Sequence, residues 1–100
     1  MISEVRTVAA DSQWMSPHCN RDSVAFHFTW HPDQNKAEAA AACVGAALEA
    51  FDVRPHWGKV FDRTQFDFGT YSGREDFLAL VDRLDSTGTF TNDWFNQVVR

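Results

Sequence analysis

Residues 23–30 constrain the fold most strongly, because their side chains alternate between apolar and small or polar. The apolar ones would share one face of a β-strand: Val24, Phe26, Phe28 and Trp30. The others would share the opposite face: Ala25, His27 and Thr29. Pro32 cannot donate to a sheet ladder, so the strand ends before it. We therefore expect a sheet that buries Phe26 and Phe28 against helices.

A second strand is predicted at residues 2–9, where Glu4 and Arg6 fall on one face, about 7 Å apart. Both can share the polar sheet face with His27 and Thr29. A half-solvated antiparallel sheet ordinarily shows polar residues to water, and an exposed ion pair contributes little to stability. An ordinary solvated face is therefore one open interpretation of these residues.

The alanine-rich residues 38–47 predict a helix, since alanine loses no side-chain entropy there. Asn35 with Glu38 resembles a capping box, and Asp33 is an alternative cap. Apolar side chains at three-to-four spacing predict the inward helix face: Ala37, Ala40, Ala41, Val44, Ala47, Leu48 and Phe51. Pro55 ends this pattern, and residues 56–61 are predicted as a short extended segment.

Two more helices are predicted toward the C-terminus. Ser72 with Glu75 forms a capping-box pattern, and Asn92 caps a final short helix. The first helix would turn these side chains inward: Phe77, Leu80, Val81 and Leu84. The elements do not follow a regular βαβ rhythm. The fold class is therefore α+β, a small, mainly antiparallel sheet with helices packed on one face.

Composition excludes several functional classes. The 100 residues fit one domain, and nine Lys and Arg against fourteen Asp and Glu give a net charge of −5. This acidic balance disfavours nucleic-acid binding, and no apolar run approaches the ~20 residues that cross a bilayer. Cys19 and Cys43 lack metal-ligand spacing. They are predicted to be free buried thiols in a reducing cytoplasm, with one disulfide as the alternative.

Residues 54–59 have the sequence RPHWGK, and this segment favours a functional site over an ordinary solvated sheet face. This segment resembles a motif near the C-terminus of FAD-dependent alditol oxidases, such as xylitol and sorbitol oxidases. Residues 2–11, 27–30 and 84–92 match the same family in the same order. These enzymes are related to D-arabinono-1,4-lactone oxidases of the vanillyl-alcohol-oxidase-like superfamily. The resemblance covers nearly the whole chain.

The resemblance implies an oxidoreductase that transfers a hydride from a polyol or sugar lactone to flavin, after which oxygen is reduced to hydrogen peroxide. It further implies that residues 1–100 form the C-terminal part of the substrate (cap) domain of such a flavoprotein. The FAD-binding domain would be absent, so FAD would belong to the full-length enzyme and none would be bound by this chain alone. Whether the isolated chain is an enzyme is left open.

The resemblance also implies roles for individual residues. Arg6 and Lys59 match catalytic cations, which can stabilise negative charge on the reduced flavin. Glu4, which forms a Glu-x-Arg motif with Arg6, and Thr29 match the substrate-binding side. His27 would be a neighbouring substrate-binding residue, and His56 with Lys59 would lie next to the cofactor; either histidine could also accept a proton. A surface lysine and a packing or hydrogen-bonding histidine are the ordinary alternatives for Lys59 and His56.

Because no phosphate-cradling glycine loop is found, we expect the chain alone to lack catalysis. Two alternatives stay open: a non-catalytic binding or assembly module that self-associates, and one subunit of a split flavoprotein oxidase. The expected partners are a polyol or sugar-lactone substrate in the complete enzyme, an FAD-domain chain and further copies of this chain. No nucleic acid or membrane partner is expected.

Overall fold

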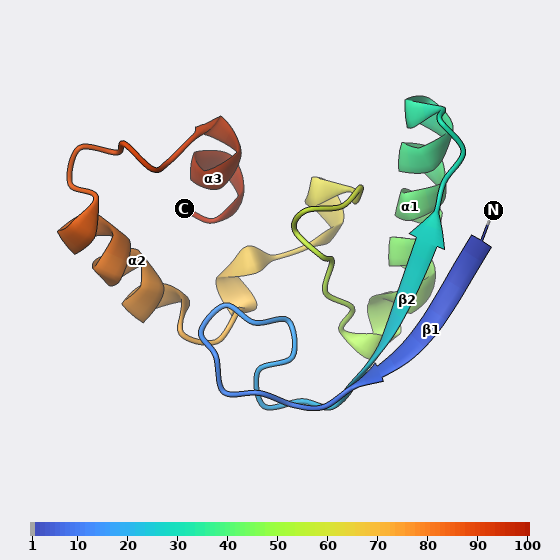
Figure 1. The fold of residues 1–100 in the computed structure, drawn as a ribbon, viewed down its shortest axis with the longest axis horizontal. Helices are drawn as coiled ribbons and strands as arrows, with labels where there is room; N and C mark the ends of the chain where they lie inside the picture. The colour runs from blue at the N-terminus through green and yellow to red at the C-terminus, as the bar shows by residue number, and fades with distance from the viewer. Residues whose placement is uncertain (1) are drawn as a thin grey trace.

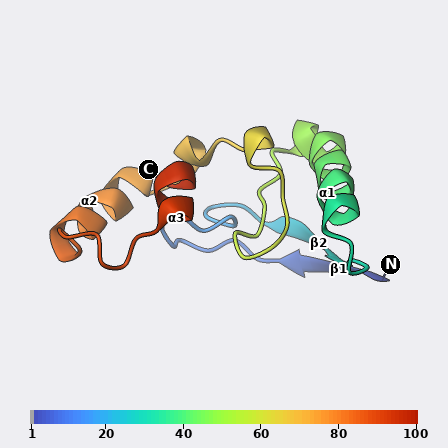
Figure 2. The same cartoon turned by 90° about the horizontal axis from the view of Figure 1, so that it is seen from above.

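The computed structural model describes residues 2–100, and its elements lie in two groups (Figure 1). At one end, the strands β1 (Ile2–Val8) and β2 (Ser23–Thr29) lie beside the helix α1 (Gln34–Leu48). At the other end, α2 (Arg74–Leu84) and α3 (Asp93–Val98) lie away from the strands, as Figure 2 also shows. Three 3-10 turns complete the described elements: η1 (Glu49–Phe51), η2 (Arg63–Gln65) and η3 (Phe68–Thr70). The α+β class is therefore confirmed.

The strands form a two-stranded antiparallel ribbon in which Glu4 pairs with His27, Val5 with Phe26 and Ile2 with Thr29. Paired residues lie on one face, so Glu4, Arg6, His27 and Thr29 share the polar face, as expected. The expected burial of Phe26 is wrong, because this side chain is 48% exposed and its neighbour Val5 is 63% exposed. Phe28 is half-buried and stacks on Trp30, with ring centroids 5.3 Å apart.

Helix α1 begins earlier than the alanine run. Its N-cap is Asp33, whose carboxylate accepts a hydrogen bond from the backbone N–H of Lys36, so the capping box at Asn35 does not form. The first turn then presents Ala37 to the interior, where it is buried. Phe51 lies beyond the end of α1 in η1 and is 72% exposed, which corrects its assignment to the inward face.

The hydrophobic core lies at the other end of the molecule, between η3, α2 and α3. Its buried members are Met15, Phe68, Tyr71 and Val99. Partly buried apolar side chains surround them: Trp57, Phe61, Phe66, Phe77, Leu78, Trp94, Phe95 and Val98. Phe68 stacks on Tyr71 at 5.5 Å between ring centroids, and Trp57 meets both rings edge-on at 5.6 Å. Such aromatic contacts add to the free energy that their burial already contributes.

The long connection between β1 and β2 joins the ribbon to this core. Asp11 fixes its course by accepting hydrogen bonds from Ser16 and from the backbone of Gln13. Met15 enters the core, and its backbone N–H donates to the Ser72 carbonyl at 2.9 Å. Trp14 lies so close to Gly73 that a Cβ there would be 2.4 Å from the indole. A side chain at position 73 is therefore excluded on steric grounds.

Several local predictions are corrected by the structure. Helix α2 is preceded by Gly73 at φ +70° and has no side-chain cap, so the capping box of Ser72 and Glu75 is wrong. Leu84 is exposed rather than inward, and residues 56–61 form no strand but contain a turn at residues 57–59. Asn92 does cap α3, as predicted, by accepting from the Phe95 backbone N–H at 2.8 Å.

The cysteine prediction is confirmed in one respect and wrong in another. Both thiols are free, but only Cys19 is buried, while Cys43 is exposed on α1. No helix within residues 2–100 combines the length and the apolar character that crossing a bilayer requires.

Candidate functional site

The polar face of the ribbon carries a cluster of three charged or titratable side chains, Glu4, Arg6 and His27. The Nη2 group of Arg6 donates to Oε2 of Glu4 at 2.6 Å. The Nδ1 atom of His27 lies 3.4 Å from the same oxygen, across the two strands. The strand alternation places Glu4 and Arg6 on one side, and the register sets His27 opposite Glu4. We call these three residues the strand cluster.

The strand cluster keeps its carboxylate charged. The hydrogen bond from Arg6, followed by that from His27, lowers the pKa of Glu4 below its usual value. The Arg6 side chain is nevertheless 64% exposed, so most of this side chain is open to solvent. The cluster therefore presents a fixed cation and a fixed anion to anything that approaches this face.

Thr29 extends this face toward the end of the ribbon. It lies two residues after His27 and pairs with Ile2, and its side chain is exposed. Same-face neighbours along one strand are separated by about 7 Å. A chain-like molecule bearing several hydroxyl groups could therefore contact the strand cluster and Thr29 together.

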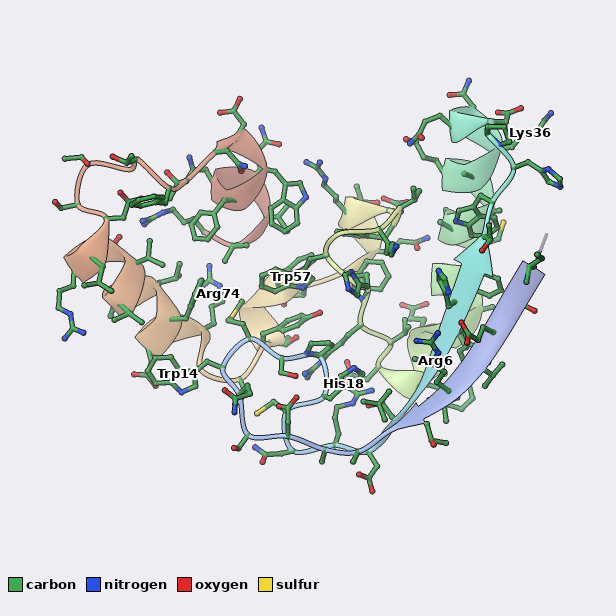
Figure 3. All side chains as sticks on the ribbon, viewed as in Figure 1. Arg6, Trp14, His18, Lys36, Trp57 and Arg74 are labelled. Atoms are coloured by element: carbon green, nitrogen blue, oxygen red, sulfur yellow. The ribbon has the colours of Figure 1, made fainter. Side chains whose placement is uncertain are left out.

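His56 and Lys59 occupy a separate turn. The Nδ1 atom of His56 accepts from the Gly58 backbone N–H at 3.1 Å, and the Lys59 backbone N–H donates to the His56 carbonyl at 3.0 Å. Both side chains are exposed. Among residues 2–100, no hydrogen bond or ion pair joins either residue to the strand cluster. Figure 3 shows Trp57, from the same turn, in the aromatic core and apart from Arg6.

One polar feature was missed by reasoning from the sequence. A cavity of about 440 Å³ opens between the end of α1 and residues 64–71, and Arg54 and Tyr71 line it. The Arg54 guanidinium lies 4.8 Å from the Tyr71 ring centroid, with Nη2 3.8 Å from Asp52. Its Nε and Nη1 groups and the Tyr71 hydroxyl are buried without hydrogen-bond partners among residues 2–100. The position of Arg54 at the start of the RPHWGK motif was the available signal.

Comparison with known proteins identifies the family. The family model described as D-arabinono-1,4-lactone oxidase matches residues 3–98. The chain belongs to this family. The match to D-arabinono-1,4-lactone oxidases therefore includes both strands of the ribbon, the turn with His56 and Lys59, and the aromatic core. It confirms the resemblance to alditol and aldonolactone oxidases inferred from the sequence.

The matching relatives are named as alditol oxidase or L-gulonolactone oxidase. An alditol oxidase from a Streptomyces species is 44% identical over 97 residues, which cover 96% of this chain and 23% of that protein. L-gulonolactone oxidases from Mus musculus and Bos taurus are 28% identical over 99 residues, covering 95% of this chain and 22% of each relative. The chain thus spans less than a quarter of the length of these relatives.

Proposed function

We propose that this chain is the substrate-side part of an FAD-dependent oxidase of polyols or sugar lactones. The strand cluster carries this proposal, because it places a guanidinium, a carboxylate and an imidazole on one open sheet face. Family membership across residues 3–98 supports the reaction class. The free thiols of Cys19 and Cys43 are typical of a reducing compartment, so we propose a cytoplasmic location.

The open face has the right donors for the reacting side of a flavin. Arg6 offers N–H groups in a rigid fork, and the exposed guanidinium can approach an electron-rich ring edge. Bound FAD would accept the hydride from the carbinol carbon and later pass two electrons to oxygen. We propose that the nucleotide part of the cofactor is held elsewhere in the complete enzyme, and that this chain alone holds none.

Arg6 and Lys59 are the proposed catalytic cations. Loss of a hydride from an alcohol carbon turns the C–OH group into a carbonyl and moves negative charge to the acceptor, where a fixed cation lowers the barrier. The same cations favour loss of the hydroxyl proton, because they stabilise the alkoxide. The choice of Arg6 rests on its fixed position beside Glu4. The choice of Lys59 rests on its motif and its exposed side chain.

The remaining residues would bind and orient the substrate. Glu4 accepts hydrogen bonds from polyol hydroxyls while it orients Arg6, and Thr29 binds a more distal hydroxyl. His27 contacts Glu4 through Nδ1, which leaves Nε2 to bind the substrate or accept the hydroxyl proton. We propose His56 as a neighbour of the cofactor, in the same turn as Lys59.

A chimeric enzyme tests these roles directly. The matching segment of the Streptomyces alditol oxidase, 23% of its length, would be replaced by this chain. Peroxide release with xylitol would then be followed. We expect the chimera to be active and Arg6→Ala to lower kcat by about 10²–10³-fold, the usual cost of losing a charge-stabilising donor. Thr29→Val should mainly raise KM.

Lys36→Ala is the matched control for Lys59→Ala, because Lys36 is a lysine at the start of α1 that is 85% exposed and forms an ion pair with Asp33. Lys36→Ala should leave kcat unchanged while Lys59→Ala lowers it. Equal kcat values for the wild-type chimera and Arg6→Ala would refute the proposed site.

A second experiment tests whether peroxide release requires the flavin-binding part of the complete enzyme. The isolated chain would be incubated with FAD, xylitol and oxygen, and we expect no peroxide above the level of its Lys59→Ala variant. Sustained turnover by the isolated chain would show that residues 1–100 suffice for the reaction. If the isolated chain is inactive and the chimera folds but is also inactive, the alternative of a non-catalytic assembly module is favoured.

A further inference from the structure

The turn that contains His56 uses the side chain of this residue as one of its own hydrogen-bond acceptors. The Gly58 backbone N–H donates to His56 Nδ1 at 3.1 Å, and the Lys59 backbone N–H donates to the His56 carbonyl at 3.0 Å. The ring lies against the Gly58 backbone, where a Cβ would be 3.4 Å from His56 Cε1. Both hydrogen bonds join residues of the same turn, so they are formed by this segment itself.

The bond from Gly58 assigns the proton of the neutral His56 ring. A backbone amide nitrogen donates and does not accept, so Nδ1 must accept with its lone pair. A neutral imidazole has one N–H group and one acceptor nitrogen, and the partner of one nitrogen therefore fixes the character of the other. The N–H group of His56 lies on Nε2. Whatever meets Nε2 in the complete enzyme must then be a hydrogen-bond acceptor.

His27 has the opposite arrangement. Its Nδ1 atom lies 3.4 Å from Oε2 of Glu4, and the pKa of this carboxyl group is lowered, chiefly by Arg6, so the group is charged. A charged carboxylate only accepts, so Nδ1 of His27 donates and Nε2 holds the lone pair of the neutral ring. The Nε2 atom is therefore an acceptor in His27 and a donor in His56.

Trp57 fixes the place of the His56 turn. Its indole ring meets Phe68 and Tyr71 edge-on, at 5.6 Å between ring centroids, and Figure 3 shows it within the aromatic core. The His56 ring is thus held by the packing of its neighbour in the chain and by its own bond to Gly58. A side chain that is already held in this way loses little further entropy when it binds, and its N–H group keeps one direction.

We propose that His56 is a fixed hydrogen-bond donor, through Nε2–H, to an acceptor atom of the flavin ring, and that it does not take a proton from the substrate. This inference rests on the proposed function, which puts His56 beside the cofactor. The lone pair of Nδ1 is directed at the Gly58 N–H, so no acceptor nitrogen is left for a hydroxyl proton. The donor would act together with Arg6 and Lys59, because negative charge increases on the flavin as the hydride arrives.

Nitrogen NMR of the full chain, with isotope label in its four histidines, tests the tautomers without any cofactor. At about pH 9, above the ordinary titration range of imidazole, we expect an unprotonated Nδ1 and a protonated Nε2 in His56. His27 should give the reverse pattern. His31, an exposed residue without a side-chain hydrogen bond among residues 2–100, is the reference and should give signals averaged between two tautomers. Replacing each histidine in turn by Gln assigns the signals. A His56 proton on Nδ1, or averaging as in His31, would overturn the proposal.

Two variants of equal size test the donor role in the chimeric oxidase. His56→Gln can place an amide N–H near the position of Nε2, whereas His56→Glu places only a carboxylate oxygen there. We expect His56→Gln to keep kcat within about tenfold and His56→Glu to lower it about 10²–10³-fold, as when a donor to developing negative charge is lost. The midpoint potential of the bound flavin should fall in His56→Glu and stay closer to the wild-type value in His56→Gln. His31→Glu is the matched control for the added charge and should change neither quantity.

The outcomes distinguish this inference from the proposed function, and the absorbance of bound FAD shows that each chimera is folded. If Arg6→Ala lowers kcat but the two His56 variants behave alike, the donor role is wrong and the oxidase proposal stands. A loss of kcat in His56→Glu with an unchanged flavin potential would also refute the contact with the flavin. If Arg6→Ala leaves kcat unchanged, the oxidase proposal and the flavin contact both fail, and the NMR spectrum still decides which nitrogen of His56 holds the proton.

Discussion

The ribbon and the aromatic core of this molecule differ in how far their apolar side chains are buried. The ribbon keeps both faces open to solvent, with Phe26 and Val5 about half exposed or more, and carries the strand cluster. In the core, Val99 is 0% exposed and the rings of Phe68 and Tyr71 stack closely. The strand cluster therefore lies outside the best-buried part of the molecule. The core acts as a scaffold for a ribbon whose groups remain accessible.

Removing a core ring gives the largest expected effect and tests this comparison directly. Phe68→Ala should reduce the free energy of unfolding by about 3–5 kcal/mol, because the ring is buried among aromatic neighbours that cannot close the cavity. The matched change in the ribbon, Phe26→Ala, should cost less than about 1 kcal/mol, since that ring is already half exposed. Urea unfolding followed by tryptophan fluorescence measures both. Equal losses would show that the ribbon is as well packed as the core.

A smaller effect is expected at the contact between α2 and the C-terminus. Arg74 donates from Nε to the Val99 carbonyl at 3.0 Å and from Nη2 to the Arg100 carbonyl at 2.6 Å. Arg74→Ala should cost about 1.5–3 kcal/mol, the range for hydrogen bonds of charged groups. Arg63→Ala is the control, because Arg63 makes an exposed contact of 3.4 Å with Gln97 and should cost under about 0.5 kcal/mol. Thermal unfolding by circular dichroism would rank the two variants.

Tyr71→Phe is expected to change stability very little. The hydroxyl is buried without a hydrogen-bond partner among residues 2–100, and burial raises the pKa of the phenol. Removing an unpaired buried hydroxyl relieves a desolvation cost, so the free energy of unfolding should stay within about 0.5 kcal/mol or increase. A loss above about 1 kcal/mol would reveal a hydrogen bond in solution. Chemical denaturation beside the wild type provides the comparison.

The smallest effect concerns the pH response of the ribbon. The folded-state pKa of Glu4 is lowered, chiefly by Arg6, so the charged form is favoured on folding. The small stabilisation is complete above the unfolded pKa and is lost as the pH falls through the lowered folded pKa. NMR titration of the Glu4 carboxyl group should therefore give a value below its ordinary one. Arg6→Ala should raise it, and an unchanged titration curve would contradict the observed pair.

Much of the local structure follows from the sequence, because alternating apolar residues favour a strand and alanine-rich segments favour a helix without help from the rest of the chain. Both strands, α1 and the Asn92 cap were predictable on this basis. The cap at Ser72 was not, since the Ser72 carbonyl is used by Met15 and Gly73 takes a left-handed conformation beside Trp14. Such contacts arise from distant parts of the chain and leave no local signal.

The candidate site, too, could be predicted from local sequence patterns only in part. Alternation placed Glu4 and Arg6 on one face, but the contact with His27 depends on the register that pairs Glu4 with His27 across the two strands. The positions of His56 and Lys59 relative to the ribbon depend on how the core holds their turn. Burial of Phe26 was predicted wrongly because α2 and α3 pack with the aromatic core rather than on the ribbon, which an apolar pattern in one strand does not reveal.

Arg6 and His27 both reach Glu4 at the same oxygen, Oε2. The other oxygen, Oε1, therefore belongs to a carboxylate whose charge is already balanced by neighbours. Under the proposed function, an incoming O–H group would therefore meet Oε1 as a hydrogen-bond acceptor on a carboxylate that is already paired, so the direction of the O–H group would matter more than the net charge of the molecule.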